Sequence, residues 1–457
     1  MPDEIVEEIS VGTLKISAFL TSVGMPAEGV RVTVSYPDSG EVIAEGLTDA
    51  EGKLSPLLLP APPEEYSLTP PDSTDNAIED ESETGGSWVE PPAEETNTNE
   101  NQEVVTPNEI TDIEPLSEEA EQPVPYGAYN ITAETEDGDV TNIFNAQIYS
   151  GIISLQSIVF PGQDDEINVP SPVIMGGFPE KIPESETKRL PSTGGLVVLP
   201  KPVVPGLIVV HSGVPSDTDV PNYTVTFKDY VKNVASSEIF ATWPREALKA
   251  NIIAICSFTM NRVFTEWYRG KGYSFTVTNS TAYDQAFTYG RTIFSEISEV
   301  VDEVFTLYIT REGITQPLLT QYSDGIRVKR SGWLSQWGSK ELADDGYNAL
   351  QILRYYYGRD IILREAEKVE GIPLSFQGVV SIGSSGEAVR TIQRQLNAIS
   401  NNFPLIPKLA VDGIFGSKTA ESVKVFQQIF NLPVNGIVNF GTWYAISDIY
   451  TAVENLA

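Results

Sequence analysis

Apolar residues recur at helical spacing in the segment FKDYVKNVASSEIF, residues 227–240. Phe227, Val231 and Val234 follow one another at intervals of four and three, which places them on one stripe of a helix. A further step of four along this stripe reaches Glu238. A carboxyl group on an apolar face is costly unless it is paired, neutral or functional. Glu238 is therefore the first candidate for chemistry, and the alternative is an exposed glutamate at a fraying helix end.

A second helix is predicted in the segment PREALKANIIAICSFTMNRVFTEWYRG, where Pro244 suits the first turn and Gly270 or Gly272 is expected to end the helix. Its inner face is marked by Leu248, Ile252, Ile255 and Thr259. Helices and short strands are mixed in this part of the chain. The pattern predicts an α+β domain over residues 207–372.

Alternation between apolar and polar residues runs from residue 10 to about residue 60, as in TLKISAFL and VRVTVSYP, and resumes in FNAQIYSGIISLQSIVF. This period of two predicts a β-sandwich within residues 1–161. Between the two groups of strands, residues 61–126 hold 19 acidic residues and no basic one. Such a composition is typical of disorder and of a solubilising role.

The stretch VRTIQRQLN at 389–397 recurs as VKVFQQIFN at 423–431. Each copy predicts an amphipathic helix, so residues 379–457 are expected to form a small helical domain. Residues 162–206 are rich in Pro and Gly and read as a linker. An exposed tether of this kind is a natural target for a protease.

The formal net charge of −35 is distributed unevenly. Residues 1–180 carry −34, whereas residues 181–457 carry −1. The chain therefore joins an acidic front to a neutral back. Nucleic-acid binding is excluded as a partner class because no basic stripe is available for it.

The chain has one cysteine, Cys256, and one histidine, His211. These counts exclude an internal disulfide framework and a thiolate zinc cluster. Cys256 is expected to be a buried inert thiol, and His211 to lie at a strand end in a structural role. No apolar run reaches the roughly 18 residues of a membrane span, and no secretory signal is visible at the start.

The segment around Glu238 resembles the signature of the stage II sporulation protein D and amidase-enhancer family. In that signature a glutamate near a helix end precedes a Trp-Pro pair, here Trp243 and Pro244, and an EALKA helix. Residues 331–358 resemble the second signature of the family, in which Ser-Gln-aromatic-Gly is followed by a helix and a tyrosine pair. The resemblance implies a lytic transglycosylase of bacterial cell wall, or a modulator of wall amidases. It implies Glu238 as the catalytic acid and base.

The same resemblance implies a set of substrate-binding residues, namely Ser237, Lys249, Tyr322, Ser323, Ser335, Gln336 and Trp337. The alternative for the two aromatic members is a place in the core, where aromatic residues are common. Glu246 is a rival carboxylate, but acids are favoured in a first helical turn for structural reasons.

The chain departs from the family where Cys256-Ser257-Phe258 replaces Arg-Thr-Tyr, and where Gly332-Trp333-Leu334 replaces His-Gly-x-Gly-Met. The metal-ligand residues of some relatives have no counterpart. We therefore expect neither a zinc ion nor another cofactor.

Two further regions carry resemblances. The N-terminal strands resemble small transthyretin-like β-sandwich modules, which bind, space or shield. Residues 379–457 resemble the three-helix peptidoglycan-binding domain. Loop and helix residues that match it are Asp412, Gly413, Phe415, Gly416, Gln427 and Trp443. The resulting fold class is multidomain α+β, with a sandwich, a central catalytic domain and a three-helix binding domain.

This order of domains resembles the clostridial spore-cortex-lytic enzymes. The resemblance implies a zymogen made in the mother cell, located at the spore cortex and coat, and activated when a subtilisin-like germination protease removes the N-terminal region. A non-catalytic wall-binding protein that stimulates an amidase is the main alternative. Ordinary muramidase hydrolysis is a third.

Overall fold

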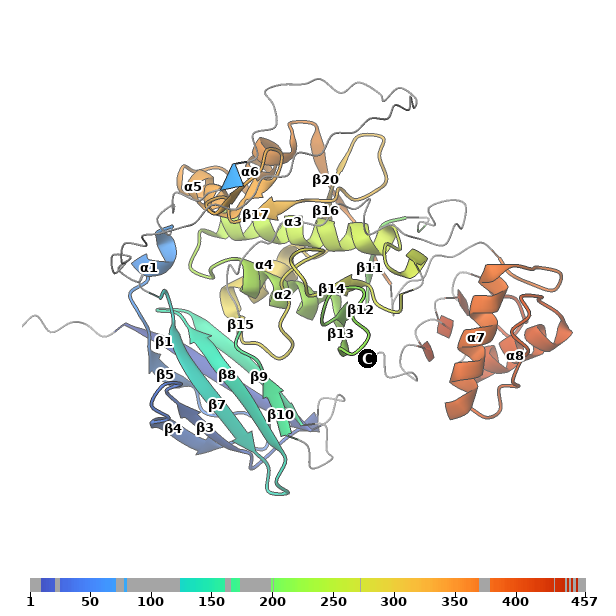
Figure 1. Ribbon diagram of the computed structural model, residues 1–457, viewed down its shortest axis with the longest axis horizontal. Coiled ribbons are helices and arrows are strands. Elements are labelled where there is room, and N and C mark those ends of the chain that lie inside the picture. The colour runs from blue at the N-terminus through green and yellow to red at the C-terminus, as the bar shows by residue number, and fades with distance from the viewer. Residues whose placement is uncertain are drawn as a thin grey trace, which may run out of the picture.

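A computed structural model of the chain shows a β-sandwich, a mixed central part and a small helical C-terminal part (Figure 1). The structure describes residues 10–20, 25–70, 78–79, 124–160, 166–172, 199, 201–271, 273–369, 379–430, 432–439, 442–443, 445–446 and 449–450.

The sandwich has two sheets whose facing side chains form one apolar core. The first sheet contains β1 (Val11–Leu20), β2 (Met25–Pro26), β5 (Leu57–Pro60), β9 (Ile153–Phe160) and β15 (Ile293–Phe294). The second has the order β10 (Glu166–Val169), β8 (Val140–Ile148), β7 (Gly127–Glu134), β3 (Arg31–Ser35) and β4 (Val42–Leu47). Buried and less buried residues alternate along β1 and β9, as the sequence predicted. The kinship with transthyretin-like modules stays a prediction.

The sandwich is joined to the central part through β15, which lies within the central part in sequence but pairs with β9 (Figure 1). Tyr149, at the end of β8, packs edge-on against Phe294 and Phe240, with ring centroids 5.1 and 6.0 Å away. Tyr149 thus belongs to the core of the central part. The sandwich and the central part therefore share a buried surface.

The two ends of the acidic segment 61–126 lie close together. The hydroxyl of Tyr129 in β7 donates to the carbonyl of Pro60 at the end of β5, at 2.6 Å. Contrary to the predicted disorder, the segment contains helix α1 (Glu65–Leu68) and strand β6 (Ile78–Glu79). Helix α1 is held because Ser67 bonds to the central part; most of the remaining segment lies outside the described residues.

The central part is built around α3 (Arg245–Phe264), which is buried along most of its length. Around it lie α2 (Phe227–Glu238), α4 (Ser295–Val304), α5 (Gln336–Asp344) and α6 (Ala349–Tyr357). A three-stranded sheet has the order β13 (Asn222–Thr226), β12 (Leu207–His211) and β14 (Val277–Thr278). Two-stranded pairs are β11 (Val203–Pro205) with β21 (Glu367–Val369), β16 (Leu307–Arg311) with β20 (Ile361–Glu365), β17 (Tyr322–Ser323) with β19 (Leu334–Ser335), and β18 (Val328–Lys329) with β6.

Helix α3 ends earlier than the sequence predicted. The expected stop was Gly270 or Gly272, but the last helical residue is Phe264. Thr265 caps the helix through its hydroxyl, which donates to the carbonyl of Asn261, and Glu266 then adopts a φ of 49°. A positive φ in a residue with a side chain breaks the helical path.

The predicted linker 162–206 also contains regular structure. Strand β10 completes the second sheet of the sandwich, and β11 pairs with β21 of the central part. Most residues between these two strands lie outside the described residues.

His211 and Cys256 occupy the structural positions that the sequence predicted. His211 ends β12, stacks on Phe275 and bonds through Nδ1 to Oδ1 of Asn222 at 2.8 Å. Cys256 is fully buried in α3, and burial raises the pKa of its thiol far above the usual range.

The C-terminal part contains α7 (Glu387–Asn402) and α8 (Ser417–Ile429), which match the two copies of the repeat. Helical stretches at 442–443, 445–446 and 449–450 stand where the third helix was expected, and the rest of that segment lies outside the described residues. The three segments share one apolar core.

Candidate active site

Glu238 is the last residue of α2, and its side chain is buried with only 2% exposure. The helix begins at Thr226, whose hydroxyl caps the backbone N–H of Asp229, and it ends where Ile239 turns into an extended conformation. Phe227, Val231 and the rest of the stripe are buried with Glu238. The spacing of the sequence therefore placed Glu238 on the correct face.

Three neutral donors surround the Glu238 carboxylate. The backbone N–H of Ala286 donates to Oε1 at 2.9 Å, and the hydroxyl of Tyr322 lies 3.5 Å from the same oxygen. Nε2 of Gln336 donates to Oε2 at 3.3 Å. These donors fix both carboxyl oxygens in place, so the surroundings of Glu238 orient its side chain.

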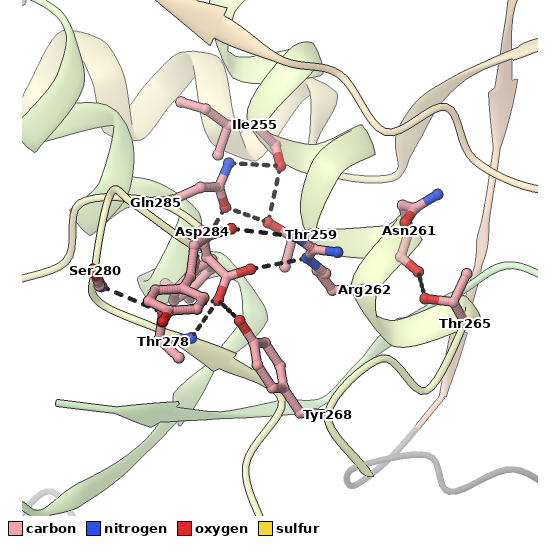
Figure 2. Close-up of polar contacts among 12 residues, drawn as sticks. Ile255, Thr259, Asn261, Arg262, Thr265, Tyr268, Thr278, Ser280, Asp284 and Gln285 are labelled. Atoms are coloured by element: carbon pink, nitrogen blue, oxygen red, sulfur yellow. Dashed lines mark hydrogen bonds and ion pairs between the residues drawn. The ribbon is translucent and has the colours of Figure 1, made fainter. Parts of the chain in front are cut away.

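The loop that carries Ala286 is fixed by a buried ion pair (Figure 2). Nε of Arg262 in α3 lies 2.8 Å from Oδ1 of Asp284, and these side chains are 4% and 0% exposed. Oδ2 of Asp284 accepts the hydroxyl of Tyr268 at 2.7 Å and both the N–H and the hydroxyl of Thr278. Asp284 therefore fixes the loop two residues before the N–H that reaches Glu238.

Gln285 connects the loop to the helices and to Tyr322. Its Oε1 accepts the hydroxyls of Thr259 at 2.8 Å and of Tyr230 at 3.1 Å, and its Nε2 donates to the Tyr322 oxygen at 3.1 Å. Figure 2 shows Gln285 against Thr259 and Ile255 of α3. Burial, followed by the charge of Glu238, raises the pKa of Tyr322 well above its ordinary value. Tyr322 thus remains a protonated donor at neutral pH.

Among the substrate-binding residues implied by the resemblance, Gln336 and Tyr322 contact Glu238 directly. Ser237 precedes Glu238, but its hydroxyl points to Arg291, which donates to it at 2.7 Å. Lys249 is not brought to Glu238. Its Nζ lies on the surface of α3, 2.7 Å from Glu303 and 3.7 Å from Glu246.

Trp337 is a core residue of the central part. Its ring lies 4.8 Å from that of Trp243 and 5.7 Å from that of Phe240, and it is almost fully buried. In this conformation Trp337 is therefore a core residue, which was the alternative to a role in substrate binding. The rival carboxylate Glu246 accepts the N–H of Ala349 at the start of α6, a structural contact.

Ser323 and Ser335 line a cavity of about 470 Å³ beside the β17–β19 pair. Its walls include Lys329, Arg330 and Trp333. Ser323 follows Tyr322 in a strand, where neighbouring side chains point to opposite faces. The cavity thus lies on the other side of the strand pair from Glu238, which is not among its lining residues.

The sequence did not predict the residues that hold the site together, which are Arg262, Tyr268, Asp284, Gln285, Ala286 and Arg291. Most of them lie in or against an irregular loop, where no hydrophobic period distinguishes a buried charge from an exposed one. Arg262 was a possible signal, because a cation within a largely apolar helix requires a partner.

The C-terminal part holds its loops by two equivalent glutamines, one in each copy of the repeat. Nε2 of Gln393 in α7 donates to Asp412 at 2.8 Å, and its Oε1 accepts the N–H of Gly413. Gln427 in α8 contacts Asn435 and Gly436 in the same manner. Each repeat thus pairs a buried helical glutamine with a following Asx-Gly turn.

Of the predicted ligand contacts in this part, Asp412 is exposed, whereas Phe415 and Trp443 lie in the core. A hydrogen bond from the N–H of Ile414, followed by one from Gln393, lowers the pKa of Asp412. Gly413 adopts a φ of 75°, and Gly416 precedes α8. Gln427 is fully buried and structural.

The helices of the described residues include none that is both long and apolar enough to span a bilayer. In that same part of the chain, no three acidic, histidine or cysteine side chains gather as a metal site.

The fold and site define a multidomain α+β protein with a buried central carboxylate and a repeat-built C-terminal domain. Residues 219–309 match the family described as stage II sporulation protein, and residues 385–446 match a peptidoglycan binding domain. These matches confirm both resemblances. The chain thus contains one region similar to stage II sporulation protein and one region similar to a peptidoglycan binding domain.

Two solved structures are similar over parts of the chain. The SleB N-terminal domain is 29% identical, with a TM-score of 0.15 and coverage of 16% of this chain and 96% of that one. A 5-hydroxyisourate hydrolase from Klebsiella pneumoniae is 17% identical, with a TM-score of 0.16 and coverage of 33% and 87%. Likenesses at these TM-scores carry no argument about fold or function. No curated protein matched the chain.

Proposed function

We propose that the protein is a lytic transglycosylase of spore-cortex peptidoglycan, with Glu238 as its single catalytic acid and base. The observation that carries this proposal is the Glu238 carboxylate, buried at a helix end and surrounded by oriented donors from Ala286, Tyr322 and Gln336. The matches to a stage II sporulation protein and to a peptidoglycan binding domain support peptidoglycan as the polymer on which Glu238 acts.

The reaction requires two proton transfers at one carboxyl group. In its acid form, Glu238 donates a proton to the glycosidic oxygen between N-acetylmuramic acid and N-acetylglucosamine, and the bond from that oxygen to the muramyl C1 breaks. Glu238, now a carboxylate, accepts the proton of the muramyl 6-hydroxyl, whose oxygen bonds to C1. A 1,6-anhydro ring forms, no water is consumed, and Glu238 returns to its acid form. A second carboxylate is not needed, unlike in ordinary glycosidases.

The burial of Glu238 supports storage as a zymogen. With 2% exposure, the carboxylate has almost no access to solvent or polymer in this conformation, so the residues that cover it must move before a sugar can reach it. We propose that a subtilisin-like germination protease starts this change by cutting the 162–206 linker, and that the precursor is made in the mother cell and stored in the spore.

The same burial favours a second candidate function. A Glu238 that never becomes accessible would serve the structure alone, and the chain would then bind the wall and stimulate an amidase. The two functions differ in whether this chain itself breaks glycan strands.

The test is digestion of purified cortex by the linker-cut protein and by its Glu238→Gln variant, followed by mass analysis of the fragments. We expect anhydro-muramyl ends from the wild type and a loss of roughly 10³-fold or more in the variant, which retains size but cannot exchange a proton. Lys249→Gln is the control and should retain activity, because Lys249 lies with Glu303.

Equal cleavage by wild type and Glu238→Gln contradicts the assigned role. No cleavage by either supports the amidase-enhancer function. Reducing ends without the loss of a water mass indicate muramidase hydrolysis.

A further inference from the structure

One arginine connects the sandwich to the end of the helix that carries Glu238. Arg291 is 3% exposed and uses all three guanidinium nitrogens as donors: Nε to Thr292 O at 3.0 Å, Nη1 to Ser237 Oγ at 2.7 Å and Nη2 to Gln147 Oε1 at 3.0 Å. Gln147 belongs to β8 of the sandwich and Ser237 to α2. Burial lowers the pKa of Arg291 to about 10, so it remains a cation at neutral pH.

A second glutamine of the sandwich binds the same loop. Nε2 of Gln156 in β9 donates to Gly290 O at 2.8 Å, and its Oε1 accepts the hydroxyl of Thr292 at 2.7 Å. Gly290 has a φ of 79°, and a β-carbon there would lie 2.8 Å from a methyl group of Val169 in β10. The loop and the sandwich therefore approach each other too closely for a larger residue.

The backbone ladder continues this contact. Ile293 of β15 lies opposite Leu155 of β9, and the adjacent Phe294 packs against Tyr149. Separation of the two parts would expose this apolar surface to water and break the hydrogen bonds that Gln147 and Gln156 make to the loop.

From these contacts we propose that the sandwich stays bound after the linker is cut, as a non-covalent subunit of the active protein. Gln147 of the sandwich is a positioning residue, because it orients Arg291 and thereby Ser237 beside Glu238. The N-terminal region is therefore not removed by the cut alone. The positioning role rests on the proposed function, whereas the association does not.

The association is tested on the full chain, with a site-specific protease sequence placed between residues 184 and 188. After the cut, the two fragments should co-elute in gel filtration at 0.15 M and at 1 M NaCl, because most of the contacts are neutral or apolar and salt screens only exposed charges. The double variant Gln147→Ala/Gln156→Ala should separate at a lower urea concentration. Asn142→Ala removes an amide of the same strand that bonds to Glu166 and Asn168 within the sandwich, and it should separate at the wild-type urea concentration. Fragments that part in buffer without denaturant overturn the proposal.

The positioning role is tested with cut, co-eluting protein. Gln147→Ala should lower kcat about tenfold with little change in KM, since one hydrogen bond to a buried cation is lost. Gln147→Glu keeps an acceptor for Arg291 and should recover most of kcat. A structural role alone would lower the fraction of folded protein without this recovery, so equal losses in both variants overturn the positioning role.

Failure of this inference is distinguishable from failure of the proposed function. Fragments that co-elute without cutting glycan leave the association standing and remove the enzyme assignment. Cortex lysis by the isolated C-terminal fragment, free of the sandwich, leaves the enzyme assignment standing and removes the proposal that the sandwich is a subunit of the active protein.

Discussion

At the scale of single residues, the candidate site contains two buried carboxylates: Glu238, which we propose to react, and Asp284, which holds the loop beside it. Glu238 accepts bonds from neutral donors, whereas Asp284 is paired with Arg262 and accepts three further hydrogen bonds. A buried ion pair adds little net stability, but the loss of one partner leaves an uncompensated charge. Asp284 therefore has a large effect on the fold although it performs no chemistry.

Asp284→Asn should lower the free energy of unfolding by about 3–5 kcal/mol, because Arg262 keeps its charge in a buried position. Urea titration measures this loss. Asp302→Asn is the matched control, since Asp302 pairs with Lys228 and Lys232 at the surface and should change stability by less than about 1 kcal/mol. Similar losses in the two variants would contradict the anchoring role of Asp284.

Lys249 provides a test of pH dependence. Its hydrogen bond lowers the pKa of Glu303, so the pair stabilises the fold above the ordinary glutamate value of 4.5 and loses that effect as the pH falls through the lowered value. Lys249→Met should therefore be less stable than wild type at pH 7, by under about 1 kcal/mol at this exposed pair. At about pH 3 the difference should shrink or vanish. Urea titration at both pH values measures it, and a difference independent of pH would show that another contact matters.

At the scale of elements, the helices were predictable and the loop between β14 and β15 was not. The stripe through Phe227 and Val231 gave the start and buried face of α2, because a helix repeats its contacts every three or four residues. The loop that supplies Ala286 has no such period. Its shape follows from long-range partners such as Arg262, which sequence spacing does not reveal.

The repeated glutamines of α7 and α8 give an element-scale prediction. Gln427→Met retains the volume but leaves the N–H groups of Asn435 and Gly436 without acceptors, at a cost of about 2–4 kcal/mol to the C-terminal domain. Hydrogen exchange of residues 432–439 should become faster. The neighbouring exposed Gln428→Met is the control and should leave exchange unchanged. Unchanged exchange in Gln427→Met would show that the turn holds without this side chain.

At the scale of the whole molecule, composition predicted the acidic front but not how the front is attached. A period of two identified the strands of the sandwich, whereas nothing in the sequence marked Ile293–Phe294 as an added strand of its sheet. Two residues are too few for a detectable period. The boundary between the sandwich and the central part is therefore a shared core and not only a linker.

Deletion of residues 81–123 removes 13 acidic residues and no basic one, which changes the net charge from −35 to −22. We expect stronger association with anionic cell wall at 20 mM NaCl and little difference from wild type at 0.5 M, because salt screens repulsion between exposed charges. Co-sedimentation with purified peptidoglycan measures this. A salt-independent gain would point to a masked binding surface in place of charge repulsion.

The contact of Tyr129 with Pro60 means that the acidic segment leaves and re-enters the sandwich at one place. Closure of a chain between two fixed points depends only logarithmically on its length, so a doubling of the segment adds roughly 0.6 kcal/mol of entropic cost. Apart from helix α1 and strand β6, which contact the central part, the segment can therefore change in length or charge with little consequence for folding. The sandwich therefore fixes where this segment starts and ends, but not how long it is.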